Sequence, residues 1–123
     1  MKKKPITAFT DEELVEEFSR CAHLWGEAVE WEKTSQAGKM VFRLRDLGDE
    51  LRRRGPAARI KLAPLMESMD PGVRYYAAHD LLALLPERSK AAIASVGNVW
   101  QFGVSFTARM TLANLEDGVF TPT

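Results

Sequence analysis

The chain has 123 residues, 46% of them hydrophobic, which is enough for one domain with its own apolar core and short for two. Seventeen basic residues balance seventeen acidic ones, so no net charge draws the whole molecule toward nucleic acid or an anionic membrane. The single cysteine, Cys21, excludes an internal disulfide, and no run approaches the roughly 20 apolar residues of a membrane span. We therefore expect a cytoplasmic protein without a membrane partner.

Two long amphipathic helices are predicted in the first half of the chain. Thr10, followed three residues later by Glu13, forms a capping box that marks a helix start, and apolar residues recur at helical spacing to about Trp31. A second helix is predicted from about Ser35 to Arg54, where a glycine and a proline follow as stop signals. Both helices have one apolar face, so we expect them to pack in a common core.

The second half of the chain predicts four shorter helices. We expect a loop at 97–103 and helices at 56–68, 70–85, 86–97 and 105–116. Pro64 should kink the first of these helices or limit its first turns. Asp70 with Pro71 gives the second one an N-cap and a proline at its first position. No period-2 strand pattern interrupts this order, so the fold class is all-α. Residues 1–9 are expected to be a flexible segment, and residues 117–123 a C-terminal tail.

The helix that follows Asp70 carries aromatic residues outside its apolar face. On a helical wheel its core arc consists of Val73, Ala77, Ala78, Leu81, Leu84 and Leu85. Tyr75, Tyr76 and His79 fall on the opposite arc. Arg74 falls inside the core arc, so we expect a carboxylate partner for it, either Asp70 or an acid of a neighbouring helix.

Two interpretations of this aromatic arc stay open. Tyrosines combine a large apolar area with a polar tip and are favoured in interfaces, so Tyr75, Tyr76 and His79 are candidate protein-binding residues, together with Trp100 of the following loop. The alternative is that the N-terminal helices fold over this surface and that the tyrosines are second-layer packing.

Residues 70–81 resemble the second helix of a HEAT repeat. The resemblance lies in the pattern Asp70-Pro71-x-Val73-Arg74-x-x-Ala77-Ala78-x-x-Leu81, and the preceding helix is similar to the first helix of the same repeat. The whole chain, to its ending LEDGVFTP, is similar to a domain-of-unknown-function family of small bacterial proteins with armadillo-like helices. This resemblance implies a right-handed α-α superhelix, or a compact six-helix array with one HEAT-like helix pair, and it implies no catalytic residues.

The two long helices differ in charge. Residues 11–34 hold eight acidic and two basic residues, whereas residues 39–62 hold eight basic and three acidic residues. A nucleic-acid patch is the alternative function that this asymmetry suggests, and its candidate residues are Arg52, Arg53, Arg54, Arg59 and Lys61. On the wheel of the predicted helix 35–54, the basic residues scatter around most of the polar circumference instead of forming a stripe along a phosphate backbone; they are Lys39, Arg43, Arg45, Arg52, Arg53 and Arg54. Pairing between the acidic and the basic helix is therefore the preferred interpretation.

Chemistry-bearing motifs are scarce in this sequence. The two histidines, His23 and His79, form no ligand spacing with Cys21, and the glycines are scattered singly. We therefore expect no catalytic site, no metal and no cofactor. The predicted function is a non-catalytic interaction module for an unidentified protein partner, a class that includes immunity-like and antitoxin-like proteins. Trp31 and Phe42 lie off the main apolar faces of their helices. With Trp100 and Phe102 of the late loop, they indicate either burial by a second layer or self-association as a homodimer.

Overall fold

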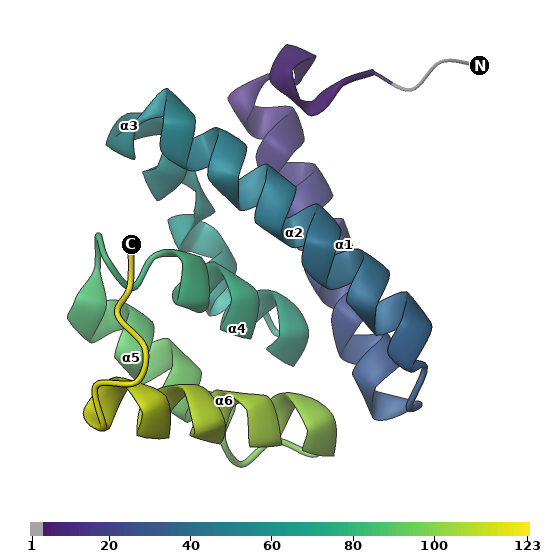
Figure 1. Cartoon of the computed structure of the whole chain (residues 1–123), viewed down its shortest axis with the longest axis vertical. Helices are drawn as coiled ribbons and strands as arrows, with labels where there is room; N and C mark the ends of the chain where they lie inside the picture. Colours follow the sequence, from purple (N-terminus) through teal and green to yellow (C-terminus); the bar gives the residue numbers. More distant parts are fainter. Residues whose placement is uncertain (1–3) are drawn as a thin grey trace.

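The computed structural model describes residues 4–123, which form helices and turns and contain no strand (Figure 1). The elements in chain order are η1 (Ile6–Ala8), α1 (Asp11–Glu30), α2 (Thr34–Arg54), α3 (Pro56–Arg59), η2 (Ile60–Glu67), α4 (Pro71–Asp80), α5 (Pro86–Ser95) and α6 (Phe102–Glu116), where η marks a 3-10 segment. One apolar cluster takes buried side chains from all six α-helices. The fold is therefore the compact six-helix, all-α array that was one of the two predicted arrangements.

Helix α1 is central to this arrangement. It packs along α2 over most of its length, and on its other side it contacts α4 and α6 (Figure 1). The predicted capping box is confirmed, because Thr10 Oγ1 accepts the Glu13 amide at 3.0 Å and Glu13 Oε1 accepts the Thr10 amide at 2.8 Å. The buried face of α1 consists of Leu14, Phe18, Cys21, Ala22, Trp25, Gly26 and Ala28.

The N-terminal segment makes fixed contacts where it is described. Residues 1–3 of the predicted flexible segment lie outside the described residues. Lys4 Nζ donates to Glu13 Oε1 at 2.8 Å, and Arg54 of α2 donates to the carbonyl of Thr7 at 3.3 Å. Residues 4–9 are therefore attached to both long helices.

A close backbone contact joins α1 to α4. A Cβ added at Gly72 would lie 2.7 Å from the carbonyl oxygen of Ala22 and 3.3 Å from the Cα of Gly26. Such distances are below the normal contact range, so only glycine fits at position 72. This contact brings the aromatic residues of α4 next to Trp25 of α1.

Residues 56–67 differ from the single kinked helix predicted for them. A short α3 gives way at Ile60 to the 3-10 segment η2, which contains Pro64. Proline has no N–H to donate and clashes with the carbonyl four residues before it, so the α-helical bonding pattern cannot continue through this region. The tighter 3-10 turns still bury Leu62, Ala63 and Met66.

Helix α4 begins as predicted but ends earlier. Asp70 Oδ1 accepts the amide of Val73 at 3.0 Å, which confirms the N-cap. The helix ends at Asp80, whereas the sequence predicted an end near Leu85. Leu81 follows the last helical residue with φ −94° and ψ 7°, and residues 81–84 form turns. Leu85, which precedes Pro86 at the start of α5, has φ −132° and ψ 65°, as expected for a residue before proline. The leucines after Asp80 reach the core from a turn.

The predicted carboxylate partner of Arg74 is wrong. Arg74 Nε donates to the carbonyl of Ser68 at 3.0 Å, and Nη1 donates to Ser95 Oγ at 3.1 Å. Asp70 is already engaged, because its carboxylate accepts the Val73 amide and lies 2.5 Å from His23 Nδ1.

Helix α6 begins at Phe102, three residues before the predicted start. Its buried face consists of Val104, Ser105, Ala108 and Thr111, and these residues face α1, α4 and α5. Among residues 4–123, no helix combines the length and the apolar character needed to cross a membrane.

Candidate functional site

Tyr75 is a core residue rather than an exposed anchor. Its ring stacks on Trp25 with centroids 5.6 Å apart, and its hydroxyl is 2.7 Å from Thr111 Oγ1 of α6. Only 4% of Tyr75 is exposed, and this burial raises the pKa of its hydroxyl. The expected binding role of Tyr75 is therefore corrected to packing, because α1 and α6 both cover it.

Tyr76 and His79 are half-buried at the edge of the same cluster. The rings of Tyr76 and Trp25 pack edge to face, with centroids 4.8 Å apart. Burial raises the pKa of the Tyr76 hydroxyl. The His79 ring is stacked on Phe120, with centroids 5.2 Å apart and planes 8° apart. Burial lowers the pKa of His79, which favours a neutral imidazole at pH 7.

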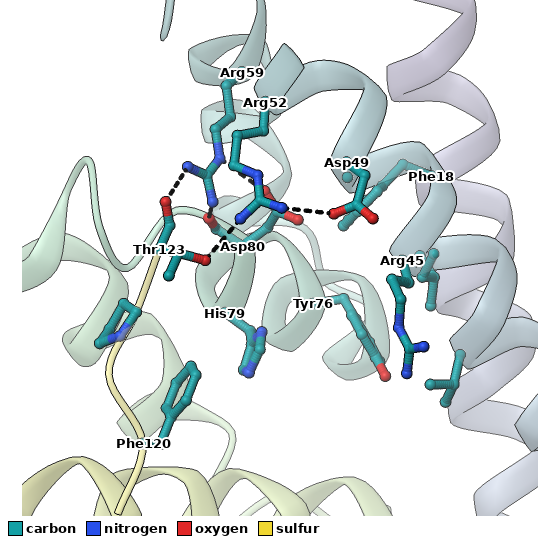
Figure 2. Close-up of a pocket in the computed structure, with 14 residues that line it drawn as sticks. Phe18, Arg45, Asp49, Arg52, Arg59, Tyr76, His79, Asp80, Phe120 and Thr123 are labelled. Atoms are coloured by element: carbon teal, nitrogen blue, oxygen red, sulfur yellow. Dashed lines mark hydrogen bonds and ion pairs between the residues drawn. The ribbon is translucent and has the colours of Figure 1, made fainter. Parts of the chain in front are cut away.

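A groove of about 300 Å³ begins where Tyr76 and His79 reach the surface (Figure 2). It lies between α2 and α4, and the segment 117–123 that follows α6 borders it on the third side. Its lining is Phe18, Val41, Leu44, Arg45, Gly48, Asp49, Arg52, Arg59, Tyr76, His79, Asp80, Phe120, Pro122 and Thr123. The floor is apolar and aromatic, and charged side chains form the rim.

Arg59 connects the groove to the segment 117–123. Its Nε donates to Asp80 Oδ1 at 3.1 Å, its Nη2 to the Asp80 carbonyl at 2.6 Å and its Nη1 to the Thr123 main-chain oxygen at 3.0 Å. Arg59 is buried, so these bonds satisfy a guanidinium that has left water. Gly48 of α2 leaves space for the Asp80 carboxylate, because a Cβ at position 48 would collide with that carboxylate.

Arg52 holds the same segment from the other rim. Its Nη1 donates to Thr123 Oγ1 at 2.8 Å, and its Nη2 donates to Asp49 Oδ1 at 3.1 Å (Figure 2). The segment 117–123 is thus held in two ways, by the stack of Phe120 on His79 and by the arginine donors to Thr123.

The other residues of the candidate nucleic-acid patch are paired with acids. Arg53 and Arg54 both bind the buried carboxylate of Glu50, and together they lower its pKa to about 2. Arg54 also reaches Asp11 at 2.9 Å, and Lys61 reaches the same carboxylate at 3.0 Å. The predicted pairing between the acidic and the basic helix is therefore present.

Trp100 does not belong to the groove. It precedes α6, is 77% exposed and is not among the groove's lining residues. The structure brings together Tyr76, His79, Arg52 and Arg59 from the predicted sets and leaves Trp100 on a separate surface.

Sequence reasoning missed several lining residues. Arg45 and Asp49 lie at helical spacing from the predicted Arg52 on one face of α2, so a wheel of that helix could have grouped them with it. Phe120 carries no such signal, because it lies about forty positions from His79 in the chain and meets it only through the fold.

The lining of the groove combines aromatic and apolar side chains with those of arginine and aspartate. Its lining holds one imidazole, that of His79, and no cysteine or serine among the residues that the structure describes. Cys21 is buried away from it, and desolvation raises the pKa of its thiol. Within residues 4–123, no group of three histidine, cysteine or acidic side chains is placed to hold a metal ion.

Comparisons with known proteins agree with the fold. The crystal structure of the protein RPA1889 from Rhodopseudomonas palustris CGA009 matches with a TM-score of 0.87 and 26% sequence identity, over 98% of this chain and 100% of that one. No curated protein matches the chain. The model of a family described as a domain of unknown function matches residues 12–116, and the chain therefore belongs to the DUF2019 family.

Proposed function

We propose that the chain is a non-catalytic protein-binding module and that the groove between α2 and α4 receives an extended segment of the partner. The observation that carries this proposal is the position of the segment 117–123, which leaves α6 through a turn at 117–119 and then lines the groove with Phe120, Pro122 and Thr123. Phe120 stacks on His79, and Arg59 and Arg52 bind oxygens of Thr123. A partner segment with an aromatic residue and a polar end three positions later matches this arrangement.

The groove is suited to recognition because it combines an apolar floor with directional donors. Aromatic stacking contributes roughly 0.5–1.5 kcal/mol beyond the area that it buries. Hydrogen bonds from a guanidinium are stronger than neutral ones and fix the direction of the bound segment. The segment 117–123 would have to leave before a partner entered, so it acts as an internal competitor.

Protein binding is preferred to nucleic-acid binding because the basic residues are already engaged. Arg53, Arg54 and Lys61 all form ion pairs with carboxylates of the chain. A phosphate backbone would have to replace these carboxylates. The HEAT-like character of residues 70–81, the bacterial cytoplasmic setting and an immunity-like or antitoxin-like role remain parts of this proposal that rest on resemblance and size.

A matched pair of charge reversals on α2 tests the proposal. Arg52→Glu changes the rim of the groove, whereas Lys39→Glu changes an exposed residue of the same helix outside it. The tagged chain and both variants, shown to be folded by circular dichroism, are used to capture proteins from native lysate. We expect one stoichiometric protein with the wild type and with Lys39→Glu, its loss with Arg52→Glu, and its release by excess peptide of residues 117–123. Equal retention by all three chains would refute the groove as the binding site.

A further inference from the structure

The outward face of α6 carries an apolar stripe that no other element covers. Phe102, Phe106 and Met110 follow one another at intervals of four residues, so they lie along one line of the helix. They are 72%, 54% and 45% exposed, and Trp100 just before them is 77% exposed. We call these four residues the α6 stripe.

The α6 stripe lies apart from the buried face of its helix. The opposite face of α6 supplies the buried residues Val104, Ser105, Ala108 and Thr111. The stripe is also poor in charge, because Arg109 is the one charged residue between positions 102 and 115. This surface offers no complementary charges to a strongly charged partner. It is complementary to a second apolar stripe.

The exposed area of the α6 stripe reaches the size that a symmetric dimer needs. A large side chain of this type has roughly 150–250 Å² to bury, so the four exposed fractions leave on the order of 500 Å² per copy. Two copies that pair these stripes remove about 1,000 Å² from water, which is the lower limit for a specific interface. A patch of about 500 Å² also lies in the upper range of those found on soluble monomers.

We propose that the α6 stripe is the interface with a second copy of this chain, in which the two α6 helices pack antiparallel across a two-fold axis at Phe106. Phe106 is the midpoint of three equally spaced apolar residues. A two-fold axis at this point therefore pairs Phe102 with the partner's Met110, and it pairs Phe106 with its own copy. Sulfur–aromatic and aromatic contacts are both favourable. The antiparallel order also opposes the two helix dipoles.

Sedimentation of the full chain and two variants tests this dimer. Phe106→Glu places a charge on the proposed axis, and Phe42→Glu places the same charge on a comparably exposed phenylalanine of α2. At roughly 100 µM, above the micromolar Kd of weak interfaces of this size, we expect the wild type and Phe42→Glu to sediment as dimers. Phe106→Glu should be monomeric, with a Kd at least about 30-fold higher. A monomeric wild type would overturn the proposal and leave the α6 stripe for a different protein.

Cross-linking tests the position of the axis. Because Cys21 is fully buried, a cysteine introduced at Phe106 is the one accessible thiol of the described residues. Under mild oxidation, Phe106→Cys should form a covalent dimer rapidly, whereas Met69→Cys, at an exposed position away from α6, should not. Equal cross-linking of both variants would overturn the proposed geometry. The result does not depend on the groove between α2 and α4, which lies outside the α6 stripe.

Discussion

Two aromatic surfaces of this molecule differ in what covers them. On α4, Tyr75 is stacked against Trp25, and His79 is stacked against Phe120. On α6, Phe102 and Phe106 are 72% and 54% exposed. Each surface lies opposite the main apolar face of its own helix, so the helix pattern alone does not separate them.

The difference is explained by which elements lie next to each helix. Helix α4 is placed between α1 and the segment 117–123, and its contact with α1 is close because Gly72 has no side chain. Helix α6 lies at the outside of the array and has neighbours on one face (Figure 1). The elements packed on the second face of a helix therefore decide whether an aromatic residue off its core arc is covered, as Tyr75 is, or exposed, as Phe102 is.

The largest expected contrast is between the two surfaces themselves. Tyr75→Ala should lower the free energy of unfolding by about 3–5 kcal/mol, because it leaves a cavity beneath Trp25 and removes the bond to Thr111. Phe106→Ala should change the stability of the monomer by no more than about 0.5 kcal/mol. Urea denaturation at low protein concentration measures both values. If Tyr75→Ala lowered the free energy of unfolding by less than about 1 kcal/mol, the burial of this residue would be contradicted.

A second pair of variants tests the close contact that covers α4. Gly72→Ala should cost about 2–3 kcal/mol, because the new Cβ meets the Ala22 carbonyl and the two helices must separate. Gly26→Ala should change stability by less than about 1 kcal/mol, since its Cβ would meet Gly72 Cα at an ordinary 3.4 Å and alanine favours the helix. Thermal denaturation compares the two variants. Equal effects at both positions would show that the helices are less tightly joined than described.

Removing the Phe120 ring should uncover part of the α4 surface. Phe120→Ala removes the stack on His79. The free energy of local opening of the segment 117–123 should therefore fall by about 1 kcal/mol. Val119→Ala, at an exposed neighbouring position, is the matched control. Hydrogen exchange of the amides at 118–120, which bond to carbonyls of α6, should become faster in the first variant alone. Unchanged protection in Phe120→Ala would mean that the stack does not hold the segment.

The smallest expected effect is the opposite pH response of the two histidines. The hydrogen bond to Asp70 raises the pKa of His23, so its contribution to stability is present below the ordinary value of 6.5 and is lost as the pH rises through the raised pKa. Burial lowers the pKa of His79, so its contribution is present above 6.5 and is lost as the pH falls through the lowered pKa.

Single substitutions separate these two contributions. Between about pH 8 and pH 5, His23→Gln should lose more stability than the wild type, whereas His79→Gln should lose less. Denaturation curves across this pH range measure the difference. Parallel pH profiles for the wild type and both variants would refute the two pKa shifts.

Local signals in the sequence predicted the helix starts well. The capping box at Thr10 and the N-cap at Asp70 depend on residues three positions apart, and both are present. The end of α4 was missed because the leucines after Asp80 fit a helical pattern although they pack from a turn. Pro86 accounts for the non-helical conformation of Leu85 but not for the end at Asp80, which precedes it by four turn residues.

The candidate site was predictable only in part. Tyr76 and His79 were identified from their arc on one helix, and Arg52 and Arg59 were identified from their charge. That these residues line one groove follows from the packing of α2 against α4, and Phe120 joins them from the end of the chain. The burial of Tyr75 was one of two open interpretations, because a single helix does not specify what packs on its second face.

The most direct test of the central claim is to map where an extended peptide binds. The chain without residues 117–123, shown to be folded, is labelled with ¹⁵N and titrated with the peptide Asp117–Thr123. We predict saturable amide shifts in α2 and α4, at Gly48, Arg52 and His79, and none with a peptide that carries Phe120→Ala. Shifts confined to α6, or no shifts at all, would contradict the proposal that the groove between α2 and α4 is the recognition site.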